Sequence, residues 1–293
     1  MSVKQRDISG VVYAFISSIS FGLLPFFSIP IKAEGMSTES LMFYRFFLAS
    51  LILGIFLLIR RRSFRITKRQ LRDLVLIGGF GYGVTALTLV SSYDYIPSGI
   101  GTTIGFMFPV FVAVFMWVFY KERLNKAIYI SLLLSIFGVF LLSYSPSEGL
   151  ISGYGIFLLM LTNVFYGSYI IGVNKSSIST LPSSISTFYV ILISMFLCLG
   201  LSLFRGSLSP IPSFQTGISL SLMAIITTII SNLTLIMAIK AIGPTITALL
   251  SPLEPLTAIV LGIIVFGEVF NFQIGLGVII IILAVSLVVK RNK

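Results

Sequence analysis

The chain has 293 residues, of which 57% are hydrophobic and 10% charged, and its formal net charge is +11. This composition excludes a water-soluble globular protein and is typical of an integral membrane protein. The sequence contains no histidine and one cysteine, Cys198, which excludes a disulfide framework within the chain and zinc or proton-shuttle chemistry based on histidine.

Ten apolar runs follow one another between short polar breaks, and each is close to the ~20 residues that a helix needs to cross a bilayer core. They predict transmembrane helices at 8–30, 40–59, 72–92, 97–119, 127–145, 152–173, 183–204, 215–239, 244–266 and 272–289. The first run lacks a small-residue cleavage pattern, so we expect a retained helix and not a signal peptide. Asp94 and Pro97 alone divide the third run from the fourth, which predicts a tight hairpin there.

The second half of the chain repeats motifs of the first half at a constant offset of 146 positions. The repeated pairs are Leu87-Thr88-Leu89 with Leu233-Thr234-Leu235, Pro109 with Pro255, Glu122 with Glu268, and Asn125 with Asn271. Because each copy holds an odd number of spans, the second copy is expected to lie inverted in the membrane. We therefore predict an all-α integral membrane protein with ten transmembrane helices in two inverted five-helix repeats. The repeats are residues 1–146 and 147–293, and together they form one membrane domain.

The basic residues predict the orientation of the chain. With ten spans and the N-terminus inside, 17 of the 20 Lys and Arg residues fall on the cytoplasmic side, where such residues are retained. Lys32 and Arg205 fall outside, and Arg45 falls within the second span. The pattern predicts a multi-pass protein of the cytoplasmic membrane with both termini in the cytoplasm. Topology and attraction to anionic headgroups then explain the net charge without a nucleic-acid partner.

Several short motifs recur in the order and spacing of a known family. The first half contains Phe21-Gly22, Tyr44-Arg45-Phe46, Tyr95-Ile96-Pro97, and Pro109 followed by Glu122; the second contains Ser251-Pro252-Leu253-Glu254-Pro255 followed by Gly267-Glu268. Over nearly the whole chain they resemble the EamA-type unit of the drug/metabolite transporter superfamily, whose ten-helix members carry it twice. The resemblance implies a basket of helices around a central cavity, with the fifth and tenth helices peripheral. It also implies transport, often export, of amino acids or related amphiphilic metabolites.

Glu254 is the acid that the sequence places deepest in the bilayer. It follows Pro244 by ten residues, which is about 15 Å along a helix and near the bilayer centre. A charged carboxylate there costs several kcal/mol unless it is paired or protonated, so Glu254 is a candidate proton-coupling or cation-binding group. The alternative is structural, with the carboxyl bonded to backbone N–H groups that Pro252 and Pro255 leave free.

Arg45 starts close to the outer end of its helix, and three roles stay open for it. Its side chain can reach headgroups or water, cap carbonyl groups of a neighbouring helix, or pair with a substrate carboxylate. Four glycines, Gly78, Gly79, Gly81 and Gly83, crowd the third span and predict a close approach of another helix.

Polar and aromatic residues within the apolar spans complete the candidate site. Asn163 and Asn232 predict either cavity lining or hydrogen bonds between helices, and Tyr82, Phe106 and Tyr166 predict aromatic walls. The predicted substrate-binding set is therefore Tyr82, Phe106, Asn163, Tyr166, Asn232, Glu254 and Arg45. No catalytic residue, metal site or cofactor is predicted.

The predicted function is secondary transport: export of amino acids or related amphiphilic compounds across the cytoplasmic membrane by alternating access at the central cavity. The alternatives are an exporter of drugs or cationic amphiphiles and, from another class, a membrane scaffold or sensor. A nucleotide-driven pump is disfavoured because no phosphate-binding loop occurs, and an enzyme because the spans offer no acid–base pair. The expected partners are a small-molecule substrate and the lipid bilayer, with protons as a candidate coupling ion. Monomer and homodimer both stay open.

Overall fold

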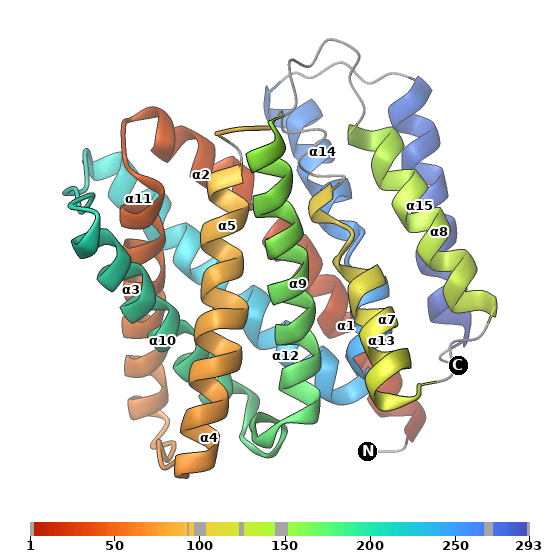
Figure 1. The fold of residues 1–293 in the computed structure, drawn as a ribbon, viewed down its shortest axis with the longest axis horizontal. Helices are drawn as coiled ribbons and strands as arrows, with labels where there is room; N and C mark the ends of the chain where they lie inside the picture. Colours follow the sequence, from red (N-terminus) through yellow and green to blue (C-terminus); the bar gives the residue numbers. More distant parts are fainter. Residues whose placement is uncertain are drawn as a thin grey trace.

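A computed structural model of the protein describes residues 3–92, 94–96, 104–122, 126–143, 152–266 and 272–291. These residues form helices and short connections, and the helices run between two ends of one bundle (Figure 1). Both chain ends are drawn in the lower part of the view, at the same end of the bundle. The motif residues Pro97, Asn125, Gly267, Glu268 and Asn271 lie outside the described residues.

The first half of the chain contains a helix that is interrupted at Leu23 and a helix that passes through a π-helical segment. α1 (Val3–Gly22) is separated from α2 (Leu24–Ala33) at Leu23, because Pro25 lacks the N–H that would bond the Phe21 carbonyl. α3 (Thr38–Ile59) begins at Ser37, whose hydroxyl accepts a hydrogen bond from the Ser40 N–H. α4 (Lys68–Asp73) continues through the π-helical segment η1 (Leu74–Gly83) into α5 (Val84–Ser92), and α7 (Phe108–Tyr120) and α8 (Lys126–Ser143) follow.

The second half has a similar order of elements. The elements are α9 (Gly153–Lys175), the 3₁₀ turn η2 (Ser177–Thr180), α10 (Ser183–Phe204), α11 (Phe214–Met223), η3 (Ala224–Ile230), α12 (Ser231–Ile242), α13 (Pro244–Leu249), α14 (Leu253–Phe266) and α15 (Phe272–Arg291). The π-helical segment η3 lies close to 146 positions after η1. Such segments are rare in α-helices and occur often at functional sites, so their recurrence supports the duplication.

Six helical segments are long and apolar enough to cross a membrane among the described residues. They are Ile8–Ala33, Thr38–Ile59, Lys68–Ser92, Gly153–Lys175, Ser183–Phe204 and Phe214–Ile242, with shorter apolar helices at Phe108–Tyr120, Lys126–Leu141 and Phe272–Leu287. The predicted span 244–266 is divided into α13 and α14 by a turn that contains Pro252. The protein is thus an all-helical membrane protein, and the count of ten spans and their inversion stay predictions.

Helices from the two halves pack against one another. α1 packs on α12 and α14, α3 on α10, and α5 on α9. The predicted close approach at the glycines is confirmed, because a methyl group added at Gly78 would lie 3.1 Å from a Val190 side-chain carbon. A methyl group at Gly81 would lie 3.0 Å from Cβ of Tyr169. Glycine therefore lets η1 lie directly on α9 and α10.

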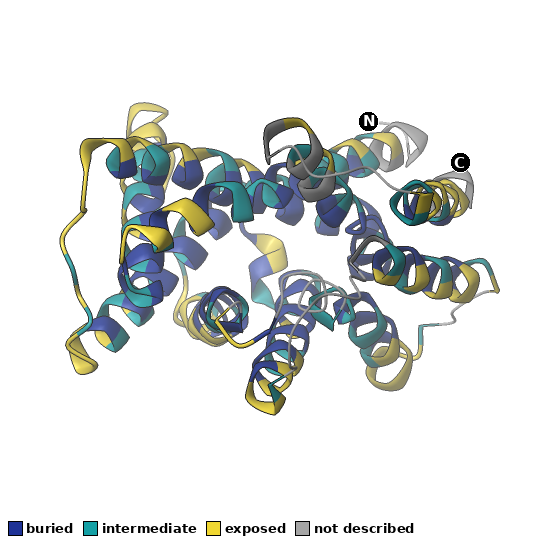
Figure 2. Cartoon of the chain, turned by 90° about the horizontal axis from the view of Figure 1, so that it is seen from above, coloured by how far each residue is buried: buried dark blue, intermediate teal, exposed yellow. Residues whose placement is uncertain are grey.

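α8 and α15 form a pair at the edge of the bundle, as the resemblance implies for the fifth and tenth helices (Figure 1). The Ser131 hydroxyl donates to the Ala284 carbonyl at 3.0 Å, which links the two helices. Figure 2 shows buried residues on the inner sides of the helices and exposed residues outside. Many of the exposed residues are large and apolar, including Ile55, Phe119 and Ile264, as expected for helices surrounded by lipid.

Candidate functional site

A cavity of about 80 Å³ is lined by residues from both halves of the chain, at the break between α1 and α2 and beside the turns that precede α7 and α14. We call it the central cavity. Its lining comes from the break between α1 and α2, from η1 and α5, from the start of α7, from α9 and from the start of α14. The lining residues are Phe21, Gly22, Leu24, Pro25, Tyr82, Thr85, Ala86, Leu89, Gly105, Phe106, Phe108, Thr162, Tyr166, Glu254 and Pro255. Interrupted helices are a recurrent way to build binding sites in transporters.

Four of the predicted site residues are brought together here: Tyr82, Phe106, Tyr166 and Glu254 all line the cavity. The aromatic side chains form a continuous wall. Phe108 meets Tyr166 edge-on, with ring centroids 4.7 Å apart, and Tyr82 lies 5.2 Å from Tyr169. The Tyr82 hydroxyl is buried and has no hydrogen-bond partner among the described residues.

Glu254 is the charged residue of the cavity lining. It is 6% exposed, and no described group donates a hydrogen bond to its carboxylate or forms an ion pair with it. Its backbone N–H donates to the Ser251 carbonyl at 2.8 Å. The structural alternative, in which N–H groups freed by Pro252 and Pro255 bind the carboxyl, is therefore not what the described residues show. A buried carboxylate without a partner is unfavourable, so the site favours a cation or a proton.

Asn163 and Asn232, which were expected in the cavity lining, are not among the residues that line this cavity. Asn163 donates through Nδ2 to the carbonyls of Ile104, at 2.7 Å, and Leu159, at 2.9 Å. Asn232 accepts a hydrogen bond from the Tyr169 hydroxyl through Oδ1. The second sequence interpretation, hydrogen bonding between helices, describes both residues, while Asn163 Oδ1 and Asn232 Nδ2 have no partner among the described residues.

Arg45 also lies outside the cavity. Its side chain is 1% exposed, so the prediction that it reaches headgroups or water is wrong. Nε donates to the Thr228 hydroxyl at 2.6 Å and an Nη donates to the Thr227 carbonyl at 3.1 Å. The guanidinium also lies 5.3 Å from the centroid of the Phe46 ring. Because π-helical η3 supplies both acceptors, the capping of a neighbouring helix describes Arg45 best.

Sequence reasoning missed Thr85, Thr162 and Gly105 in the lining. Both threonine hydroxyls bond to carbonyls of their own helices, Thr85 to Gly81 and Thr162 to Leu158. Such threonines look like ordinary residues of an apolar helix. A usable signal was the proline just after each interruption, since Pro25, Pro109 and Pro255 all lie in the first turn of a new helix.

A second, larger cavity of about 840 Å³ lies at the end of the bundle opposite the chain ends, and we call it the vestibule. Two ion pairs line it: Lys32 with Asp94 at 2.6 Å, and Arg205 with Glu39 at 2.5 Å. Thr88 of the vestibule and Thr162 of the central cavity share a hydrogen bond of 2.7 Å. This bond therefore lies between the two cavities.

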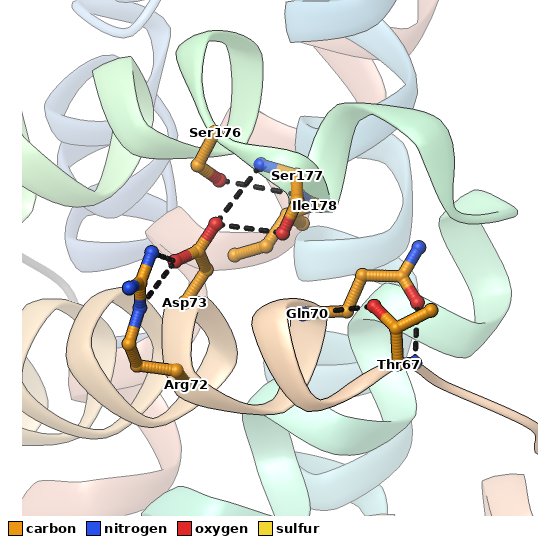
Figure 3. Close-up of polar contacts among 7 residues, drawn as sticks. All are labelled: Thr67, Gln70, Arg72, Asp73, Ser176, Ser177 and Ile178. Carbon is orange, nitrogen blue, oxygen red and sulfur yellow. Dashed lines mark hydrogen bonds and ion pairs between the residues drawn. The ribbon is translucent and has the colours of Figure 1, made fainter.

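Polar contacts join the two halves at the other end of the bundle (Figure 3). The Asp73 carboxylate at the end of α4 accepts hydrogen bonds from the Ser177 N–H at 3.1 Å and the Ser177 hydroxyl at 2.6 Å. Arg72 binds the other carboxylate oxygen at 3.1 Å. Next to them, Thr67 and Gln70 cap the start of α4 reciprocally. These contacts fasten α4 to η2 where the vestibule does not reach.

Comparisons with known proteins agree with this architecture. A model of the EamA-like transporter family matches residues 8–144 and, a second time, residues 153–290. The chain is 26% identical over 152 residues to an uncharacterized transporter of Archaeoglobus fulgidus, a match that spans 52% of this chain and 53% of that protein. A protein crystal structure superposes with a TM-score of 0.84 at 14% identity and covers 96% of this chain and 98% of its own. That likeness concerns the fold alone.

Proposed function

We propose that the chain, which belongs to the EamA-like transporter family, is a secondary transporter that exports small metabolites across the cytoplasmic membrane. The substrates in this proposal are amino acids or related amphiphilic compounds, and they bind in the central cavity. The observation that carries the proposal is Glu254, a buried carboxylate without a described partner in a cavity between interrupted helices. If Glu254 had only a structural role, we would expect its carboxylate to have hydrogen-bond partners within the protein.

The placement of the two cavities supports alternating access as the mechanism of this proposal. The vestibule lies above the central cavity at one end, and the Asp73–Ser177 contact joins the two halves at the other end. This arrangement supports a state open toward the outside, if the end with α4 faces the cytoplasm as the basic residues predict. In this proposal residues 1–146 and 147–293 are two inverted five-helix repeats that rock about the cavity.

Two refinements belong to the same proposal. In this proposal Glu254 exchanges a proton with either side as access alternates and so couples export to a proton gradient. An exporter of drugs or cationic amphiphiles is the second candidate function, and the negative charge of the cavity favours it. The oligomeric state in this proposal is a monomer or a homodimer.

The experiment is solute flux into proteoliposomes that contain the purified chain, with amino acids, nucleosides, sugars and amines as the panel. Gly105→Phe tests the cavity, because the nearest atom to a Cβ added at Gly105 is 3.7 Å away and the ring would fill the lining space. The matched control is Gly217→Phe on α11, where the nearest atom is 4.0 Å away. We expect saturable flux of at least one solute, lost in Gly105→Phe and kept in the control. Absence of flux from the whole panel, or full flux through Gly105→Phe, would contradict the proposal.

A further inference from the structure

We infer that the central cavity recognises an organic ammonium group, which binds the Glu254 carboxylate, and that it rejects compounds with a free carboxylate. The inference rests on the proposed transport function, and within it selects the second candidate class, cationic amphiphiles, over amino acids. It separates amines from amino acids, which carry the same ammonium group together with a carboxylate.

The charge of the cavity lining carries the first step. Glu254 supplies a carboxylate, and none of the lining residues is Lys or Arg. The buried cation of this region is Arg45, whose donors point to Thr227 and Thr228 and which does not reach the lining. A ligand carboxylate would therefore meet a like charge and no cation. A ligand ammonium would supply the counter-charge that the described structure does not give Glu254.

The other polar groups of the lining are compatible with an ammonium donor. The Thr85 hydroxyl donates to the Gly81 carbonyl, and the Thr162 hydroxyl is within hydrogen-bond distance of the Leu158 carbonyl and the Thr88 hydroxyl. The Tyr82 hydroxyl is buried without a described partner, and because it can both donate and accept a hydrogen bond it does not discriminate between ligands. Glu254 is therefore the group of the lining whose charge selects a cationic donor.

The aromatic wall favours the same ligand class. Tyr82, Phe106, Phe108 and Tyr166 all line the cavity, with Phe108 set against Tyr166 at 4.7 Å. Aromatic faces attract organic cations, and the attraction is larger where water is excluded. The remaining lining residues are mainly apolar, which suits the carbon body of the ligand.

A metal ion fits this cavity less well. Ca²⁺ takes about 6 to 8 oxygen ligands and Mg²⁺ about 6 in strict geometry. The lining offers one carboxylate, and the described residues contain no group of three or more Cys, Asp or Glu side chains that could hold a metal. The volume of about 80 Å³ instead suits a compact organic head group in this state.

Ligands that share one carbon skeleton and differ in charge test the inference. The series is 3-methylbutylamine, leucine, 4-methylpentanoate and uncharged 3-methylbutanol, tested at neutral pH by thermal stabilisation of the purified full chain. We expect the amine to bind at least about tenfold more tightly than leucine and the acid to be undetectable, as one buried charge pair implies. Equal binding of amine and leucine, or tighter binding of the acid, would overturn the inference.

Variants assign the effect to the carboxylate. Glu254→Gln should reduce the amine to about the affinity of the alcohol, whereas Glu34→Gln, a matched change of an acid outside the lining, should keep the preference. A tenfold preference that survives in Glu254→Gln would overturn the assignment. If Glu254→Gln does not fold, the inference is tested by the affinities of the wild-type protein for the amine, leucine, the acid and the alcohol, together with the variants Tyr166→Phe and Tyr166→Leu. Tyr166→Phe, which keeps the aromatic ring, should bind the amine about threefold more tightly than Tyr166→Leu. Equal affinity of the two variants for the amine would contradict the role of the aromatic wall.

The two proposals fail in different ways. Saturable flux of some panel solute without preference for the amine would support the transport function and contradict the proposed specificity for amines. Amine binding at Glu254 without flux of any solute would keep the site and remove the transport function.

Discussion

The backbones of Gly22 and Glu254 lie in direct contact, although the two residues are separated by most of the chain. A methyl group added at Gly22 would lie 2.5 Å from the Glu254 carbonyl oxygen and 2.9 Å from Cβ of Thr257. Gly22 is the last residue of α1 and Glu254 is the second residue of α14, so glycine lets the breaks in the two halves of the chain lie against each other. Both residues line the central cavity, so this contact lies at the cavity wall.

The first prediction concerns this contact. Gly22→Ala should lower the free energy of unfolding by about 1–3 kcal/mol, because the added methyl group forces the two backbones apart. Thermal melting of the purified protein measures the effect. Gly217→Ala is the control, since the nearest atom to its Cβ is 4.0 Å away. Equal melting temperatures of Gly22→Ala and Gly217→Ala would contradict this prediction, because they would show that α1 and α14 can move apart without loss of stability.

The second prediction concerns the contact drawn in Figure 3. Asp73→Ala leaves the Ser177 N–H and hydroxyl without their acceptor and should destabilise the protein by about 1–3 kcal/mol. Arg72→Ala removes a partner of the same carboxylate whose side chain is 67% exposed, and its effect should stay below about 1 kcal/mol. Similar losses in both variants, measured by melting, would contradict the importance of the Asp73–Ser177 contact.

The third prediction concerns Arg45. Lysine is a compact point charge and cannot reproduce the fork that binds both Thr228 and the Thr227 carbonyl, so Arg45→Lys should destabilise the protein by about 1–3 kcal/mol. Because Arg45 is not in the cavity lining, ligand affinity of the folded fraction should change little. An Arg45→Lys variant that has the melting temperature of the wild type but no longer binds the ligand would contradict this prediction and support recognition of the substrate by Arg45.

The fourth prediction concerns orientation. Single cysteines at Ser63 and at Gln215, which are both exposed, should react with an impermeant maleimide from opposite sides of the membrane in a Cys198→Ser background. Ser63 follows Arg60, Arg61 and Arg62 and is expected inside. Labelling of Ser63→Cys from outside intact cells would reverse the proposed topology and the direction in which the vestibule opens.

Much of the helical framework could be predicted because apolar periodicity and length are local properties of the sequence. The predicted run 183–204 is α10 to the residue, and 40–59 lies within α3. The interruptions were harder to predict, because a proline in an apolar run is compatible with both a kink and a full break. The structure resolves this at Pro25 and Pro255, where new helices begin.

The site could be predicted only in part. Glu254, Tyr82, Phe106 and Tyr166 were expected in the cavity and line it, whereas Asn163 and Asn232 are not among its lining residues. Sequence gives the depth of a residue in a span but not the side of the helix that faces the cavity. Hydrogen bonds such as that between Tyr169 and Asn232 depend on tertiary packing and carry no local signal.

The central claim is that substrate and coupling proton meet at Glu254, and transport by Glu254→Gln in proteoliposomes tests it most directly. Glutamine keeps the shape of the side chain and removes its ionisation. The account predicts that accumulation driven by a pH gradient is lost, while exchange persists at equal, saturating substrate concentrations on the two sides. Accumulation in a folded Glu254→Gln variant with the same dependence on the pH gradient as the wild type would contradict the claim.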